Sequence, residues 1–185
     1  DVGAYASLDG DLSFTLYGRH TRTWVNSRGA EWRNELQIGN EVLLATSLFQ
    51  PLDAAHRLFI EPQLRYSRSA EDIFRDGERI SRYNLTDAGG VLDLGVNMGR
   101  FAQVRAGYVY SNRNVEVDIG PTLFPETDTV DAGLRLSLDF DSRDTAFRPT
   151  RGMAAALEYL SSDESLGAER GWQRAELGVG MALPL

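Results

Sequence analysis

The chain has 185 residues and a formal net charge of −8, with 42% hydrophobic and 25% charged residues. This length suffices for one domain with a core. The acidic balance and the lack of a basic stripe argue against a nucleic-acid partner, and the absence of cysteine excludes disulfides and thiolate metal sites. No run approaches the ~18 apolar residues that a membrane helix needs, and no signal peptide is visible at the start.

Apolar and polar residues alternate along most of the chain, which is the period of a β-strand. The alternation predicts about ten strands, over residues 2–8, 11–24, 29–38, 42–52, 57–70, 79–98, 101–113, 128–141, 151–161 and 171–184. Short connections alternate with the longer polar segments 70–78, 114–127 and 162–170, and Gly39-Asn40 predicts a tight hairpin turn. The fold class is therefore all-β, an antiparallel up-and-down arrangement forming a single domain over 1–185.

The predicted strand 128–141 shows most clearly that each strand has two unlike faces. Leu134, Leu136 and Leu138 lie on one face, and Arg135 and Asp139 lie on the other. The same pattern in other strands defines a set of charged residues that we expect to share the polar face and to line a hydrated lumen: Glu35, Glu61, Arg65, Asp93, Arg105, Asp131, Arg135 and Asp139.

Two architectures accommodate such strands: a soluble sandwich or small barrel, and a transmembrane β-barrel. The predicted strands exceed the ~5–6 residues usual in soluble folds and match the ~9–11 tilted residues that cross a bilayer. Several aromatic residues near the predicted strand ends would suit the headgroup level of a membrane: Trp24, Phe101, Tyr108, Tyr110, Phe140 and Trp172. These features favour the transmembrane barrel, with a soluble β-barrel that binds a small ligand as the alternative.

The stretch "DFDSRDTAFRPTRG" carries the first resemblance to a known family. It resembles the strand-turn-strand signature of the bacterial outer-membrane assembly superfamily that includes BamA and TamA, through an aromatic residue, spaced aspartates and Pro-Thr-x-Gly. The matching positions are Phe140, Asp141, Asp144, Phe147, Pro149, Thr150 and Gly152.

A second stretch, Glu31 to Ser67, is similar to the early barrel strands of patatin-like outer-membrane proteins, the PlpD type of type V autotransporter. The positions that carry this likeness are Trp32, Glu35, Leu36, Gln37, Gly39, Gln50, Pro51, Leu52, Asp53, Phe59 and Pro62. The resemblance implies an outer-membrane anchor or translocator with a patatin-like phospholipase domain upstream in the same polypeptide. A barrel-assembly insertase like BamA is an alternative within the same superfamily.

The resemblance also implies a topology and a set of partners. The short turns would face the periplasm, and the barrel would have about sixteen strands, of which this chain supplies the N-terminal ones. Membrane lipid, the passenger domain of the same polypeptide, the barrel-assembly machinery and a second copy of the chain are the expected partners. An open sheet would leave two unpaired edges, so further strands must complete it.

The turn after the strand 128–141 is rich in charge, and we expect its side chains to pair locally and hold the register of the strands beside it. The residues of this predicted periplasmic turn motif are Asp141, Arg143, Asp144, Pro149, Arg151 and Gly152. The alternative interpretation is an ordinary charged hairpin.

The sequence contains no Gly-x-Ser-x-Gly motif and no Gly-rich phosphate loop, so we expect neither catalysis nor a cofactor in this chain. His20 and His56 are far apart in the sequence and lack flanking ligands, which argues against a metal site.

Overall fold

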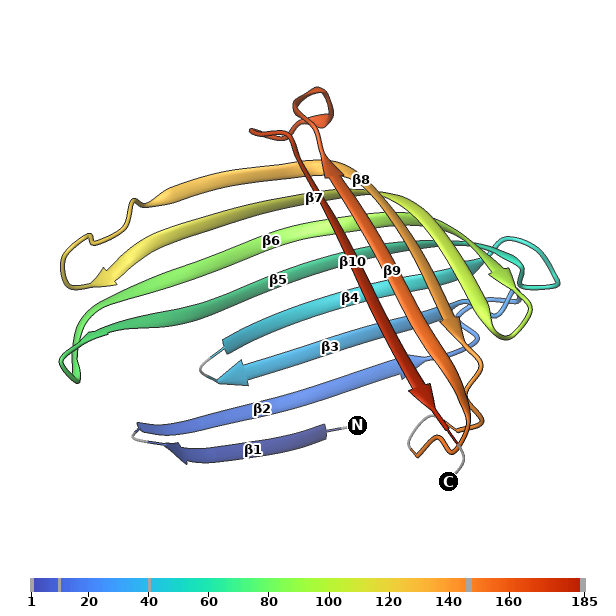
Figure 1. Cartoon of the computed structure of the whole chain (residues 1–185), viewed down its shortest axis with the longest axis horizontal. Helices are drawn as coiled ribbons and strands as arrows, with labels where there is room; N and C mark the ends of the chain where they lie inside the picture. The colour runs from blue at the N-terminus through green and yellow to red at the C-terminus, as the bar shows by residue number, and fades with distance from the viewer. Residues whose placement is uncertain (1, 10, 40, 146–147, 184–185) are drawn as a thin grey trace.

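The computed structural model describes residues 2–9, 11–39, 41–145 and 148–183, and these form one ten-stranded antiparallel sheet in which the strands follow one another in chain order (Figure 1). The elements are β1 (Val2–Asp9), β2 (Asp11–Arg22), β3 (Glu31–Gly39), β4 (Glu41–Pro51), β5 (Leu58–Arg75), β6 (Glu78–Met98), β7 (Ala102–Ile119), β8 (Thr127–Asp141), β9 (Gly152–Ser162), the 3₁₀ turn η1 (Glu164–Leu166) and β10 (Trp172–Ala182). Within the described residues, no helix is long and apolar enough to cross a membrane.

Each predicted strand corresponds to one observed strand, but the predicted loop 70–78 is largely wrong and the predicted loop 114–127 is shortened to residues 120–126. β5 runs on to Arg75 and turns only at Asp76 and Gly77, which have φ of 53° and 84°, and β7 runs on to Ile119. In the β7 extension the alternation is reversed, because Val115 and Val117 pair with Leu85 and Tyr83 on the concave side while Glu116 lies on the convex side. The Tyr83 side chain is buried there, and its hydroxyl donates to Phe124 O at 3.1 Å. Asn40, Phe147 and Pro184, on which predictions also fell, lie outside the described residues.

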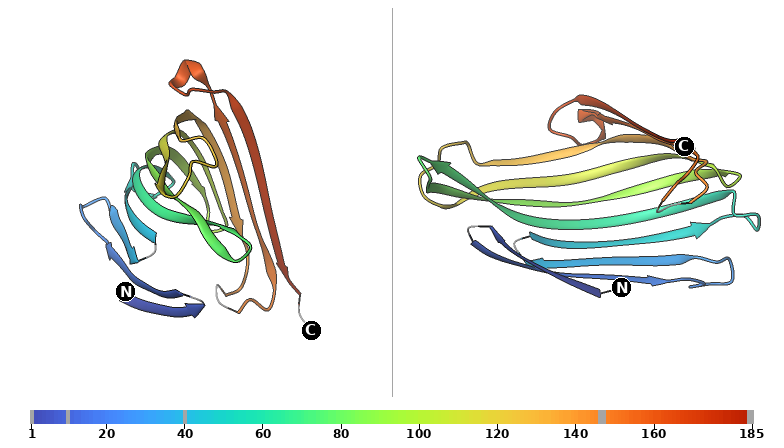
Figure 2. Two further views of the ribbon diagram at one scale, coloured as in Figure 1. Left: turned by 90° about the vertical axis from the view of Figure 1, so that its left-hand side faces the viewer. Right: turned by 60° about the horizontal axis from the view of Figure 1, so that its bottom comes forward.

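The sheet is strongly curved and does not close on itself (Figure 2). Among the described strands, β1 pairs only with β2 and β10 pairs only with β9, so each keeps one edge without a neighbour. β10 is exposed along almost its whole length, including Leu177 and Val179. Unpaired edges of this kind invite pairing with a further strand.

The two faces of the sheet have a burial pattern opposite to that of a soluble protein. Asp93 is 0% exposed, whereas its neighbours Leu92 and Leu94 are 48% and 56% exposed. Leu134 and Leu136 are likewise more than half exposed, while Arg135 between them keeps only 19% of its side-chain surface. The polar side chains therefore gather on the concave face, and the large apolar side chains cover the convex face.

Close packing on the concave face depends on glycines opposite large side chains. The Phe59 ring is 1% exposed and packs against Phe49 with ring centroids 4.7 Å apart. It occupies the space above Gly95, because a Cβ there would lie 2.0 Å from Phe59 Cζ. The Arg105 guanidinium covers the ring at 5.7 Å from its centroid, so the ring has little room to move.

We expect Gly95→Ala to reduce the free energy of unfolding by about 1–3 kcal/mol, because the added methyl group overpacks a filled site. Gly180→Ala is the control, since no atom lies within 4 Å of the Cβ it would add. In urea titrations, the loss in Gly95→Ala should be partly relieved when Phe59→Leu is added. Equal midpoints for Gly95→Ala and Gly180→Ala would contradict this account of the packing.

Candidate functional site

The strand register places all eight charged residues of the predicted lumen set on the concave face. The register pairs Glu61 with Asp93, and it sets Asp93 and Arg135 on either side of Gly107. Residues aligned across a sheet share a face. The same register aligns the remaining members of the set in rows: Glu35 with Ala45 and Arg65, Gly95 with Arg105 and Ser137, Ser111 with Asp131, and Gln103 with Asp139. Whether this face lines a closed lumen stays a prediction.

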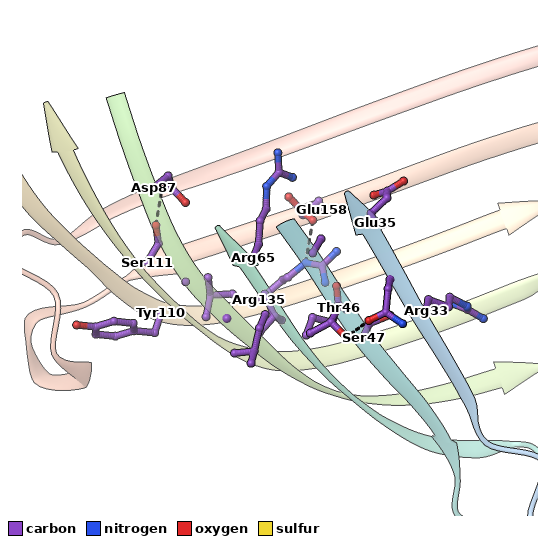
Figure 3. A pocket seen from close by; sticks show the side chains of 18 of the residues that line it. Arg33, Glu35, Thr46, Ser47, Arg65, Asp87, Tyr110, Ser111, Arg135 and Glu158 are labelled. Atoms are coloured by element: carbon purple, nitrogen blue, oxygen red, sulfur yellow. Dashed lines mark hydrogen bonds and ion pairs between the residues drawn. The ribbon is translucent and has the colours of Figure 1, made fainter. Parts of the chain in front are cut away.

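The centre of the concave face is an ion-pair network around the buried Asp93 carboxylate. Arg135 Nη1 donates to Asp93 Oδ2 at 2.8 Å, and Arg135 Nε donates to Glu158 Oε2 at 2.8 Å. Figure 3 shows Arg135 and Glu158 reaching toward each other from β8 and β9. A single guanidinium therefore ties three strands together through its side chain.

A second buried carboxylate, Glu61, extends the network toward the N-terminal strands. Glu61 is 3% exposed and lies 3.6 Å from Arg33 Nη1 and 3.5 Å from Arg105 Nη2. Together with Asp93, Arg135 and Glu158, these residues give three carboxylates and three guanidinium groups, so the core of the face is neutral overall. Such balance limits the desolvation cost of burying charges.

Three buried oxygens in this region have no hydrogen-bond partner: Glu61 Oε2, Asp93 Oδ1 and Ser137 Oγ. They lie near a broad concave cavity of about 730 Å³ whose lining includes Arg33, Arg135 and Glu158. Buried polar atoms ordinarily have a partner, so the face is suited to holding water or a polar segment.

The remaining members of the lumen set lie outside this network. Glu35 accepts hydrogen bonds from Arg19 and from the Tyr17 hydroxyl, Asp131 accepts from Trp172 Nε1 at 2.6 Å, and Asp139 is exposed near the end of β8. Arg65 contributes to the lining of the cavity without a partner in the central network.

The predicted lumen set omits several residues that complete the site. Glu158 is the one charged residue in β9 and bonds Arg135, and Arg33 and Arg19 pair with carboxylates of the predicted set. Asp87 accepts a hydrogen bond from the Ser111 hydroxyl at 3.0 Å (Figure 3). The isolated charge within the apolar stretch of β9 was a usable signal for Glu158.

We expect removal of either member of the Asp93–Arg135 pair to cost on the order of 3 kcal/mol of stability, because the remaining charge is left buried without its partner. Asp93→Leu combined with Arg135→Met should cost less than the sum of the single changes. Chemical denaturation of the four proteins measures this coupling. Glu176→Gln serves as the control, since Glu176 is 62% exposed and pairs with an exposed Arg174; additive effects at Asp93 and Arg135 would overturn the coupling.

The predicted turn motif forms a local network between β8 and β9. Asp144 accepts hydrogen bonds from Thr150 N at 3.0 Å, Thr150 Oγ1 at 2.5 Å and Arg151 N at 3.3 Å. The backbone N–H of Asp144 donates to Arg151 O at 3.2 Å. One carboxylate therefore satisfies several groups across the turn, and Arg151 takes part through its backbone.

The other residues of the motif support the same turn. Arg143 donates to both carboxylate oxygens of Asp141, at 3.0 and 2.7 Å. Gly152 has φ of 110°, and a Cβ there would lie 2.6 Å from Ser142 O, so only glycine fits without strain. Pro149 lies in the same turn, directly before Thr150. Ser142, which is not part of the predicted motif, exchanges hydrogen bonds with Met153.

The Asp144 carboxylate is stabilised in its charged form, first by the Thr150 hydroxyl, which lowers its pKa from 3.8 to about 2. Because the pKa of Asp144 is lower in the folded state, its carboxylate stabilises the turn at pH values above the unfolded-state pKa. This contribution is lost as pH falls from about 4 toward 2. We expect Thr150→Val to move the titration midpoint of Asp144 upward from about 2 toward 3.8, as followed by the carboxyl ¹³C signal.

The matched control for this titration is Thr145→Val, because Thr145 reaches Asp144 only through its backbone N–H at 3.0 Å. The Asp144 midpoint should stay near 2 in this variant. Equal midpoints in both variants would show that the Thr150 hydroxyl is not the main cause of the lowered pKa.

Of the aromatic residues expected at a membrane interface, Trp172 is placed differently by the structure, whereas Trp24 lies near a strand end as expected. Trp172 pairs with Ser162 on the concave face, where its indole N–H donates to Asp131. Trp24 lies in the turn after β2 with φ of 53° and is 72% exposed. The prediction was wrong for Trp172, although the alternation of β10 itself places Trp172 on the same face as Glu176 and opposite Leu177; the prediction rested only on its position near a strand end.

No family model matches the chain, and no curated protein matches it. Among solved structures, the chain is similar to BamA from Haemophilus ducreyi, in a crystal structure lacking POTRA domains 1–3, with a TM-score of 0.72 and 13% sequence identity. The match covers 96% of this chain and 35% of the BamA chain, so this chain spans about a third of that chain's length. The likeness shows a shared fold.

Proposed function

We propose that the chain is part of a β-barrel in a bacterial outer membrane, with the convex face toward lipid and the concave face toward a hydrated interior. The observation that carries this proposal is the inverted burial, in which Asp93 is fully buried while Leu92 and Leu94 are exposed. A soluble ligand-binding β-barrel would bury the apolar face, so the same observation argues against that alternative.

The extent of the apolar surface agrees with a membrane. The convex side of β5 is apolar from Leu58 to Tyr66 and ends at Arg68, and that of β8 is apolar from Val130 to Phe140. These lengths match the ~9–11 residues per tilted strand that cross a hydrocarbon core. The extensions of β5, β6 and β7 would then project into water on the side opposite the turn that contains Asp144 and Gly152.

As its role, we propose that this barrel anchors, or passes across the membrane, another domain of the same polypeptide. The similarity of the segment Glu31 to Ser67 to patatin-like autotransporters supports a lipase as that domain, and the chain itself would then supply no catalytic group. An insertase for other barrels is the second candidate, because the structural similarity to BamA favours it equally.

The anchor or translocator role and the insertase role can be distinguished by removing the protein from the organism that makes it. Loss of an anchor or translocator should remove the accompanying domain from the cell surface, as measured by protease accessibility, and leave other barrels intact. Loss of an insertase should lower the amounts of many outer-membrane barrels together. A protein that remains in the buffer-soluble fraction without detergent would contradict both.

We expect Leu136→Arg to destabilise the membrane-embedded protein by roughly 2–4 kcal/mol, because it places a charge on the lipid-facing side at mid-strand. Leu136 is 52% exposed in the isolated sheet, so in water the same change would have little effect. The control is Leu123→Arg, at a residue 41% exposed in the connection between β7 and β8. Unfolding from lipid vesicles measures both, and equal stabilities would refute the lipid-facing assignment.

A further inference from the structure

The convex face carries one group of polar side chains where lipid-facing residues are expected, and the proposed function makes this group unusual. His20, Asn34 and Thr46 lie in one row on β2, β3 and β4, since the register pairs His20 with Asn34 and Asn34 with Thr46. Leu36 and Leu44 lie beside this row on the same face. In hydrocarbon, polar groups require partners.

The row satisfies only part of its own hydrogen-bonding capacity. Trp32 Nε1 donates to Thr46 Oγ1 at 2.8 Å, Thr46 Oγ1 donates to Asn34 Oδ1 at 2.9 Å, and Asn34 Nδ2 donates to His20 Nδ1 at 3.4 Å. The second N–H of the Asn34 amide and Nε2 of His20 have no partner among the described residues. Both face outward on an exposed surface and are available to an external ligand.

A cation lies beside this row at the end of β2. Arg22 pairs with Trp32 in the register and is exposed, two residues from His20 and thus about 7 Å away along the strand. Arg22 has no carboxylate partner among the described residues, and the described convex sides of β2, β3 and β4 carry no acidic residue. The charge of this corner of the face is therefore complementary to an anion.

A shallow apolar groove of about 740 Å³ begins on the other side of the polar row. Gly18 and Ala88 leave space in it, and Leu36, Leu44, Leu64 and Tyr66 flank it. Along the strands, the order from the end at which β2 finishes is thus cation, hydrogen-bonding row and apolar groove.

We propose that this surface binds one phospholipid of the periplasmic leaflet, an inference that rests on the proposed membrane barrel. The phosphodiester contacts Arg22 and His20, the ester region accepts from Asn34, and an acyl chain lies in the groove beside Gly18. The order of groups along the strands is the order of groups along a phospholipid, from headgroup to tail. A second copy of the protein does not combine an anion for the Arg22 end of this surface with an acyl chain for the groove.

The test uses the protein in the polypeptide in which it occurs, purified in detergent and titrated with lipid in native mass spectrometry. Phosphatidylglycerol should bind to the wild type. Diacylglycerol, which lacks the phosphate, and glycerol phosphate, which lacks the chains, should each bind at least about tenfold more weakly, because each loses either the charge-assisted hydrogen bonds or the apolar contact.

The double variant Arg22→Gln, His20→Leu should weaken phosphatidylglycerol binding by about tenfold, through loss of charge-assisted hydrogen bonds. Asn34→Leu should weaken it less. The matched control is Arg68→Gln, which removes the arginine at the opposite end of the same face and should leave the affinity unchanged.

Unchanged binding in the double variant would overturn the lipid site, as would an equal loss in Arg68→Gln. A wild-type dimer that the double variant converts to a monomer would replace the lipid with a second copy as the occupant. The proposed function is judged separately, by whether the wild type requires detergent and inserts into vesicles. A protein that inserts but shows no difference between the variants refutes only the phospholipid site.

Discussion

The register of the ten strands is the constraint on which every other feature depends. A slip of one residue would move each side chain to the opposite face, so Leu136 would enter the ion-pair network and Arg135 would meet the apolar side. The backbone ladder alone tolerates such slips, because its hydrogen bonds do not depend on side-chain identity. Side chains must therefore select one register.

Two kinds of side-chain contact make this selection at different distances from the turns. At the strand ends, the Asp144 carboxylate closes the turn between β8 and β9, and Gly152 admits a backbone conformation that other residues avoid. In the middle of the sheet, Arg135 meets Asp93 and Glu158 only when three strands are aligned together. A pair of buried opposite charges is a modest source of stability but a strict geometric condition, which suits it to specifying alignment.

The strands could be predicted because alternation is a local property that each segment shows by itself. The face assignment of Glu61, Asp93 and Arg135 followed from the same alternation. The partners of these residues could not be predicted, since Glu158 meets Arg135 through a pairing between separate strands. The end of β5 was missed because its extension lacks a regular alternation. The end of β7 was missed because its alternation changes sense, so that Val115 and Val117 lie on the face that is charged in the rest of the strand.

The free edges of β1 and β10 connect this architecture to its surroundings. β10 exposes Leu177, Val179 and Met181 at 61–70% on the convex side, and its outer edge has no described neighbour. Water would favour aggregation of such an edge, and lipid would tolerate the apolar side chains but not the unpaired backbone. The apolar side chains and the open edges therefore place different demands on the environment. Both demands are met when further strands continue the sheet from each edge until it closes within a bilayer, which leaves the charged network inside and the apolar band outside.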